Sequence, residues 1–219
     1  MKVWQQHSVG PYQIVELFER FRFLFQGPFH ELTVPGWLDI NGTFRPWIIK
    51  AFEKRLIDHF GKNEPLSILS FGLGAGMVAN LQEHWQVDFV EKDELIIQIA
   101  NEHFSLPKSS RVINSSAETF LSGNWKTKYD VVFYDLFCGK KMCSHLLTRK
   151  SLSKLRGLVK ARGILCFDIT DNPQELYWFT KLLHEKHDVT IRHDVFPANR
   201  LRQNILVTEI KALCDKGHH

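Results

Sequence analysis

The chain contains little of what metal sites and disulfide scaffolds need. Its 219 residues include four cysteines and no Cys-x-x-Cys pair, so the ligand spacing of a zinc site is absent. The cysteines are Cys138, Cys143, Cys166 and Cys214. A domain of this size does not need disulfides, and we expect the thiols to be reduced. His184 and His187 lie three apart on an expected helix, the histidines form no metal-binding signature, and we expect no bound metal.

Long apolar runs and charge runs are also absent. No apolar stretch is long enough to cross a bilayer, and the first residues lack the apolar core of a signal peptide. The net charge is only +4, and no run of Lys or Arg marks a nucleic-acid surface. We therefore expect a cytoplasmic protein with neither a membrane nor a strong nucleic-acid partner. With 44% hydrophobic residues the chain can bury a proper core. We divide it into a small β-rich N-terminal extension, 1–45, and a nucleoside-binding domain, 46–219.

A glycine-rich loop after an apolar strand is the most informative pattern. Residues 67–76 read Ser-Ile-Leu-Ser-Phe-Gly-Leu-Gly-Ala-Gly, and a second apolar run ends at Glu91, fifteen residues later. This is the spacing of a nucleotide-binding βαβ unit. Gly72 permits the tight turn, Gly74 lets backbone approach a ligand, and Gly76 lets helix and strand pack closely. Glu91 is predicted to bind both ribose hydroxyls; the alternative is a surface acid that ends a strand.

Apolar periodicity predicts the elements around this loop. Residues 12–26 alternate imperfectly, which predicts a β-hairpin or small meander. Strands are predicted near 66–71, 87–91, 111–114, 129–135, 164–169, 189–195 and 203–210. Helices are predicted near 46–60, where Thr43 could cap the first turn, and near 76–84, 93–104, 117–122, 148–160 and 174–186.

The order of these elements predicts an α/β fold. Fully apolar strands such as 129–134 imply a mostly parallel seven-stranded sheet covered on both faces. The final two strands are too close along the chain for a parallel crossover, so they predict an antiparallel C-terminal hairpin. This is the Rossmann-like arrangement of class I methyltransferases, and it disfavours an NAD-dependent dehydrogenase.

Further motifs follow the glycine loop in order. They are Val-Glu-Lys-Asp at 90–93, Arg-Val-Ile at 111–113, Ser-Ala-Glu-Thr-Phe-Leu at 116–121, Tyr-Asp-Val-Val-Phe-Tyr-Asp at 129–135 and Gly-Ile-Leu at 163–165. With these motifs, residues 64–210 resemble the spermidine synthase (polyamine aminopropyltransferase) superfamily as a divergent member. The resemblance implies that S-adenosylmethionine, or its decarboxylated form, is the ligand. The expected binding residues are Gly72, Gly74, Gly76, Glu91, Ser116, Ala117 and Asp135.

Several positions depart from the family pattern. The family's glycine loop carries an acid where this chain has Ala75, and that acid holds the amine of the decarboxylated donor. Neutral Ala tolerates the carboxylate of ordinary S-adenosylmethionine, which an Asp would repel. Ser116 replaces the Asp that contacts the adenine amine. Residues 135–139, Asp-Leu-Phe-Cys-Gly, keep only the first acid of the family's catalytic loop. Because 46–48 read Pro-Trp-Ile in place of Tyr-His-Glu, we do not expect putrescine as the acceptor.

Asp135 is the predicted catalytic residue. It follows the fourth strand at the edge where ligands bind in such sheets, and it could deprotonate or position a nucleophilic amine. The alternative is an Asp that caps the following loop or helix. Asp168 and Asp171 end the next strand and could contact an acceptor, although the second also fits an ordinary helix entry. His30 could line the site, and Trp47 and Trp178 are candidates for ligand stacking.

Three functions fit these residues. The first is methyl transfer, or another S-adenosylmethionine-dependent transfer, to a small or medium acceptor. The second is aminopropyl transfer with an acceptor held by residues that do not align. The third is a non-catalytic member that binds a nucleoside or a partner chain. The resemblance also implies a homodimer through the N-terminal region, where Phe21, Phe23 and Phe25 could provide the interface.

Overall fold

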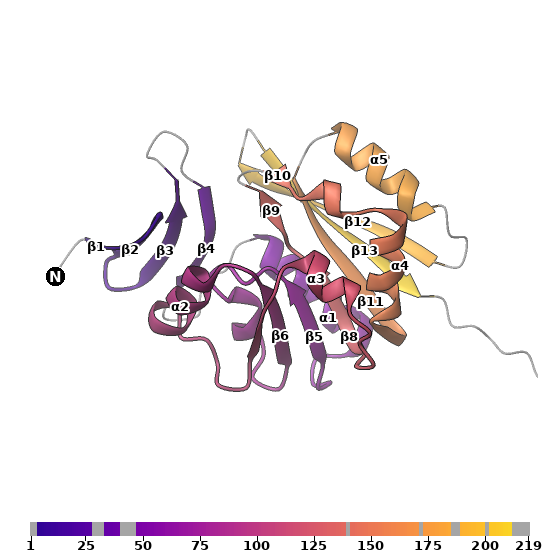
Figure 1. Ribbon diagram of the computed structural model, residues 1–219, viewed down its shortest axis with the longest axis horizontal. Coiled ribbons are helices and arrows are strands. Elements are labelled where there is room, and N and C mark those ends of the chain that lie inside the picture. Colours follow the sequence, from indigo (N-terminus) through magenta and orange to yellow (C-terminus); the bar gives the residue numbers. More distant parts are fainter. Residues whose placement is uncertain are drawn as a thin grey trace, which may run out of the picture.

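The computed structural model contains a small sheet near the N-terminus, a large sheet that forms the main body, and a two-stranded hairpin (Figure 1). The structure describes residues 4–27, 33–39, 47–138, 141–170, 173–184, 189–199 and 202–211.

The small sheet is an antiparallel meander, in agreement with the expected hairpin or meander. Its strands are β1 (Trp4–Val9), β2 (Tyr12–Leu17), β3 (Phe21–Gln26) and β4 (Thr33–Asp39), in that order across the sheet. Tyr12, Ile14 and Leu24 are buried on one face, as the two-residue period of a strand requires. The interruption near residue 19 is a turn in which Phe18 and Glu19 have positive φ. This turn sets the register between β2 and β3.

The large sheet has seven strands in the order β12-β13-β11-β8-β5-β6-β7. The strands are β5 (Ser67–Phe71), β6 (Gln86–Glu91), β7 (Arg111–Asn114), β8 (Tyr129–Tyr134), β11 (Val159–Thr170), β12 (Val189–Asn199) and β13 (Arg202–Lys211). The five from β11 to β7 are parallel, and β13 and β12 join them antiparallel. The predicted sheet and its C-terminal hairpin are confirmed.

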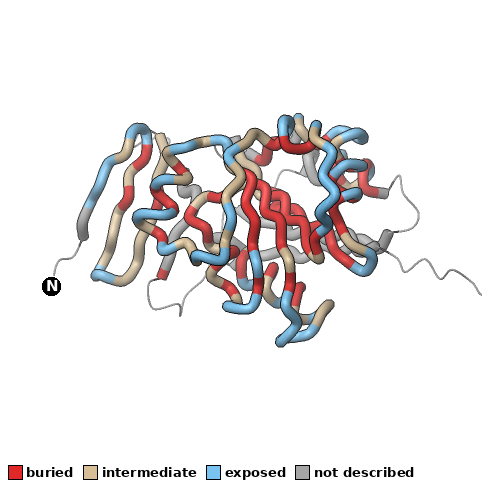
Figure 2. Tube along the Cα trace, turned by 60° about the horizontal axis from the view of Figure 1, so that its bottom comes forward, coloured by how far each residue is buried: buried red, intermediate tan, exposed pale blue. Residues whose placement is uncertain are grey.

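Helices cover both faces of this sheet. They are α1 (Trp47–Phe60), α2 (Glu94–His103), α3 (Ala117–Ser122), α4 (Arg149–Gly157) and α5 (Pro173–His184). One core cluster joins α1, α2 and the small sheet to one face, and a second joins α3, α4 and α5 to the other. Figure 2 shows the buried strands running between these layers. Burial on both faces explains why the central strands are almost entirely apolar.

Helix α1 runs antiparallel to the central strands. Phe52 stacks on Phe133 of β8 with ring centroids 4.4 Å apart, and His59 Nε2 lies 2.9 Å from the carbonyl oxygen of Arg162 near the start of β11. The amino end of α1 therefore points toward the carboxyl-terminal edge of the sheet. The expected cap, Thr43, lies outside the described residues.

The prediction of a helix over 76–84 is wrong. The structure has only a short 3₁₀ helix, η2 (Met77–Asn80). Nine residues, 77–85, connect Gly76 to the start of β6. A helix long enough to return along a strand of about 17 Å needs about 11 residues, because an α-helix rises only about 1.5 Å per residue. The connection is too short for that, and the buried side chains of Leu81 and Trp85 fill the space instead.

Contacts with α2 attach the small sheet to the main body. The hydroxyl of Tyr12 donates to Asp93 Oδ2 at 2.6 Å, and Asp93 is the N-cap of α2. Arg22 donates to the carbonyl oxygen of His103 at the other end of the helix. Two hydrogen bonds at opposite ends of one helix fix the orientation of the small sheet against it.

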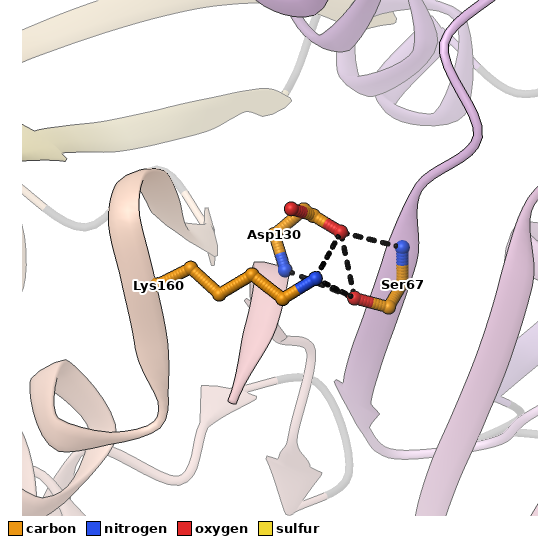
Figure 3. Close-up of polar contacts among 3 residues, drawn as sticks. All are labelled: Ser67, Asp130 and Lys160. Carbon is orange, nitrogen blue, oxygen red and sulfur yellow. Dashed lines mark hydrogen bonds and ion pairs between the residues drawn. The ribbon is translucent and has the colours of Figure 1, made fainter. Parts of the chain in front are cut away.

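A polar cluster lies at the amino-terminal edge of the large sheet, where β5 and β8 begin (Figure 3). The backbone N–H and the hydroxyl of Ser67 donate to Asp130 Oδ2 at 2.9 and 2.7 Å. Lys160 Nζ lies 2.9 Å from the same oxygen and 3.0 Å from Ser67 Oγ. Lys160 Nζ donates to both the carboxylate of Asp130 and the hydroxyl of Ser67. The cluster links three strands at the edge opposite the glycine loop.

Candidate functional site

The glycine loop lies against the end of β8. The Asp135 N–H donates to the Phe71 carbonyl at 2.9 Å, which holds the segment after β8 beside the end of β5. Gly72 has φ of 95°, and a Cβ added there would lie 2.3 Å from the carbonyl oxygen of Asp135. Gly74 and Gly76 also have positive φ. Gly72 is thus required both by its backbone conformation and by the close approach of the next strand.

Glu91 is bound to the backbone around it. Its Oε2 accepts from the Leu73 N–H of the glycine loop at 3.2 Å. Its Oε1 accepts from the N–H groups of Lys92 and Asp93 at 2.8 and 2.9 Å. A carboxylate oxygen accepts about two hydrogen bonds, so Oε1 is fully used and Oε2 retains one acceptor position. The carboxylate orders the loop and can accept one further hydroxyl without losing a bond.

Ser116 and Ala117 form the start of α3, beside the end of β7. Ser116 Oγ accepts from the Thr119 N–H at 3.1 Å and is the N-cap of the helix. The Ser115 N–H donates to the Glu91 carbonyl at 2.9 Å, which holds this turn beside the end of β6. Ala117 is buried. The sequence placed both residues near the glycine loop, and the cap is the local role that the structure gives to Ser116.

Ala75 lies in the apolar core, 1% exposed. Its methyl group offers neither charge nor a hydrogen bond at this position of the loop. An acid there would be buried among apolar side chains, at a cost that a neutral methyl group avoids.

Two carboxylates lie side by side at the carboxyl-terminal edge. Cys166 and Phe167 of β11 pair with Phe133 and Tyr134 of β8. Asp168 follows Phe167, and Asp135 follows Tyr134. Because side chains alternate along a strand, both carboxylates point to the face that α1 covers. Asp168 is 5% exposed, and its Oδ1 has no hydrogen-bond partner among the described residues.

Burial perturbs both acids. Protein surrounds Asp135, although its surface is not fully closed to water, and burial raises the pKa of Asp135 to about 7. Burial and then the charge of Asp135 raise the pKa of Asp168 well above its ordinary value. Two adjacent buried carboxylates cannot both ionise without a large cost. The pair therefore retains at least one proton near neutral pH.

The pairing of Asp168 with Asp135 was missed in the sequence. The sequence places Asp168 at the end of a strand together with Asp171, which lies outside the described residues. The sequence did contain a signal for this pairing. Strands β11 and β8 are expected to be neighbours, and each acid follows a run of four apolar residues. Only the register showed that they are adjacent.

A small hairpin follows Asp135. It consists of β9 (Phe137–Cys138) and β10 (Lys141–Met142), and the Cys143 N–H donates to the Leu136 carbonyl at 2.8 Å. The Tyr134 hydroxyl donates to the Cys143 carbonyl at 3.0 Å. Cys143 is disulfide-bonded, so the expectation of reduced thiols is wrong at this position, while Cys166 is free and buried.

The remaining candidates contribute less. Trp178 lies on α5 with 45% of its surface exposed. His30 and the side chain of Trp47 lie outside what the structure describes. Within the described residues, no group of three or more His, Cys, Asp or Glu side chains is arranged to hold a metal ion. No described helix is both long and apolar enough to span a membrane.

Comparison with known proteins gives one curated relative and many structural ones. No protein-family model matches the chain. A polyamine aminopropyltransferase from Vibrio vulnificus is 34% identical over 110 residues, which cover 47% of this chain and only 37% of that protein. A probable spermidine synthase from Corynebacterium glutamicum superposes with a TM-score of 0.76 at 13% identity, over 96% of this chain and 81% of that one. Human methyltransferase-like protein 13, in complex with SAH, gives 0.56 at 16% identity, over 76% and 78%.

These likenesses agree with the topology of the large sheet. The chain therefore has a spermidine synthase-like fold, which is an α/β fold of the class I methyltransferase type with a small β-rich N-terminal extension.

Proposed function

We propose that this protein binds S-adenosylmethionine at the carboxyl-terminal edge of the large sheet and transfers its methyl group to a small or medium acceptor. The observation that carries the proposal is the joint placement of Glu91 and Asp135 on either side of the glycine loop. Glu91 offers an acceptor for a ribose hydroxyl, and Asp135 lies where the transferable group would meet an acceptor. Gly72, Gly74, Gly76, Ser116 and Ala117 complete the proposed donor site.

The short η2 helix supports a nucleoside ligand over a dinucleotide. A pyrophosphate in a Rossmann fold is held at the amino end of the helix that follows the glycine loop. Here that segment is a four-residue 3₁₀ helix, which has only a small dipole. An adenosyl sulfonium has no phosphate and does not need such a helix. This favours S-adenosylmethionine over NAD.

In the proposed transfer, the residues of this chain position the acceptor and take a proton from it. When bound, the donor supplies a methyl group on a positively charged sulfur, which is already a good leaving group. The acceptor needs alignment and a free lone pair. Asp135, with its pKa raised to about 7 by burial, is suited to take a proton from an acceptor amine near neutral pH.

Aminopropyl transfer from decarboxylated S-adenosylmethionine is the second candidate. It is supported by the likeness of about half the chain to a polyamine aminopropyltransferase. Asp168 also gives the site a second buried acid in addition to Asp135. Against it stands Ala75, which provides no acid for the donor amine. A non-catalytic role in binding a nucleoside or a partner chain would leave the donor site intact without transfer.

Calorimetric titration with S-adenosylmethionine tests the donor site. We expect binding that Glu91→Ala abolishes, because this variant removes both the ribose acceptor and the bond that orders Leu73. Asp135→Asn should retain donor binding and lose transfer. The matched control is Asp130→Asn, which alters a carboxylate at the opposite edge of the same sheet. Equal loss of donor binding in Asp130→Asn and Glu91→Ala would argue against a local role for Glu91.

We also propose that the small sheet forms a homodimer interface. Strand β3 places Phe21, Phe23 and Phe25 on the face opposite the buried Leu24, and each of the three is half-buried. The rings of Phe23 and Phe25 stack with centroids 6.0 Å apart. Sedimentation velocity should show a dimer that Phe23→Glu dissociates, and a wild-type monomer at all concentrations would contradict this proposal.

A further inference from the structure

The acid pair at the carboxyl-terminal edge contains Asp168, which lies outside the motifs at 129–135 and 163–165. Asp168 follows Phe167 in β11 as Asp135 follows Tyr134 in β8, and those preceding residues are register partners. Neighbouring strands lie about 4.8 Å apart, so residues that follow paired positions on two adjacent strands, and that point to the same face, lie close together. The two carboxylates therefore lie close enough to interact, and the charge of Asp135 acts on Asp168.

The surroundings of Asp168 disfavour its charge. Its side chain is 5% exposed, its Oδ1 accepts no hydrogen bond from the described residues, and its register partner on β13 is Leu206. Burial away from water with an unpartnered Oδ1 disfavours the ionised carboxylate relative to the neutral carboxylic acid. The geometry alone therefore favours a protonated Asp168.

Other charged groups around the edge do not reverse this preference. At the carboxyl-terminal edge, Glu91 ends β6, Tyr134 ends β8 and Glu118 lies in the first turn of α3, and none of them would stabilise a second negative charge. On α1, Lys50 is exposed and Glu53 accepts from Gln82 at 2.6 Å. The causes that shift the pKa of Asp168 are its burial and the charge of Asp135, and both raise it.

We propose that Asp168 is a positioning residue that keeps its proton at neutral pH, so that Asp135 alone changes its charge beside the acceptor. The proposal rests on the proposed role of Asp135 in group transfer. If Asp168 were ionised, its negative charge would hold the proton on Asp135, and Asp135 could not accept another. A neutral Asp168 leaves Asp135 free to ionise near neutral pH.

The proton balance of the transfer follows from this arrangement. An acceptor ammonium gives one proton to the Asp135 carboxylate, which leaves the amine with a free lone pair. The nitrogen then forms a bond to the methyl carbon as the carbon–sulfur bond breaks, and the bonding electrons remain on sulfur. The proton on Asp135 passes to water after the product leaves. Asp168 keeps its own proton throughout, so it takes part only through Asp135.

A titration of the protein without ligand tests the proposal. Aspartate labelled with ¹³C at the carboxyl carbon reports the protonation of each side chain across a pH series by NMR. Asp135→Asn and Asp168→Asn identify the two resonances, and Asp88→Asn is the matched control. Asp88 is also a buried acid with an unpartnered Oδ1, but its other oxygen is bound by Arg111 and Tyr129 at the amino-terminal edge.

The expected result is an Asp168 resonance that remains protonated at pH 7, with a second midpoint near pH 7 from Asp135. Asp168→Asn mimics the protonated acid, so it should leave the Asp135 midpoint within about one pH unit. A larger downward shift, or an Asp168 carboxyl that titrates in the ordinary acid range, would overturn the proposal. If Asp168→Asn does not fold, the wild-type titration alone decides.

This experiment is independent of the donor. Failure to bind S-adenosylmethionine would remove the proposed function and leave the titration unchanged. Where transfer is measurable, the pH midpoint of kcat should be the same in Asp168→Asn as in the wild type. A change in that midpoint of more than about one unit would contradict the positioning role.

Discussion

Gly72→Ala should destabilise the protein more than a glycine-to-alanine change usually does. Gly72 has φ of 95°, where an L-residue costs about 1–2 kcal/mol. The added Cβ would also lie 2.3 Å from the carbonyl oxygen of Asp135, a backbone atom that cannot rotate away. Relieving such an overlap by a backbone shift costs about 1–3 kcal/mol more. The expected total of about 2–5 kcal/mol is a large part of the stability of a typical domain.

Urea unfolding at equilibrium measures this change. Gly157→Ala is the matched control, because Gly157 lies in α4, has no positive φ, and an added Cβ there meets nothing within 4 Å. It should be neutral or stabilising by up to about 1 kcal/mol, since alanine favours a helix more than glycine does. A Gly72→Ala variant within about 0.5 kcal/mol of the wild type would refute the close approach of the glycine loop to β8.

Three further predictions concern the same parts of the molecule. Because the folded-state pKa of Asp135 is raised to about 7, its contribution to stability is complete below the unfolded pKa and is lost as pH rises through 7. Asp135→Asn should thus gain up to about 4 kcal/mol over the wild type between pH 4 and 8, measured by urea unfolding at each pH, and an unchanged difference would contradict the shift. Tyr12→Phe should lose about 1–2 kcal/mol in the same assay, because it removes the donor to Asp93, and no loss would mean that the small sheet docks without this bond. Glu91→Gln should weaken donor binding at least tenfold by calorimetry, because an amide has a single oxygen, and undiminished affinity would argue against Glu91 as a ligand residue.

The sequence predicted the fold well where apolar runs and chain length sufficed. Largely apolar strands such as β8 indicated the parallel sheet, and the short link between the last two strands indicated the antiparallel hairpin. The expected helix over 76–84 failed because periodicity ignores how far the connection must reach. The disulfide at Cys143 was missed for a related reason, since its formation depends on three-dimensional proximity.

The candidate site was predicted unevenly. Glu91 and Asp135 could be placed at strand ends because apolar runs stop directly before them. The hydrogen bonds of Glu91 could not be predicted, because its carboxylate accepts from backbone N–H groups whose positions depend on the folded turn. The significance of Asp168 lay in the register of β11 on β8, which apolar strands do not encode residue by residue.

In the proposed function, the glycine loop and Glu91 bind a nucleoside donor whose carboxylate is retained. The decisive measurement is calorimetric titration of the protein with S-adenosylmethionine and, separately, with its decarboxylated form. We expect a clear preference for S-adenosylmethionine that Glu91→Ala abolishes. Preference for the decarboxylated donor, or binding of neither ligand, would contradict it.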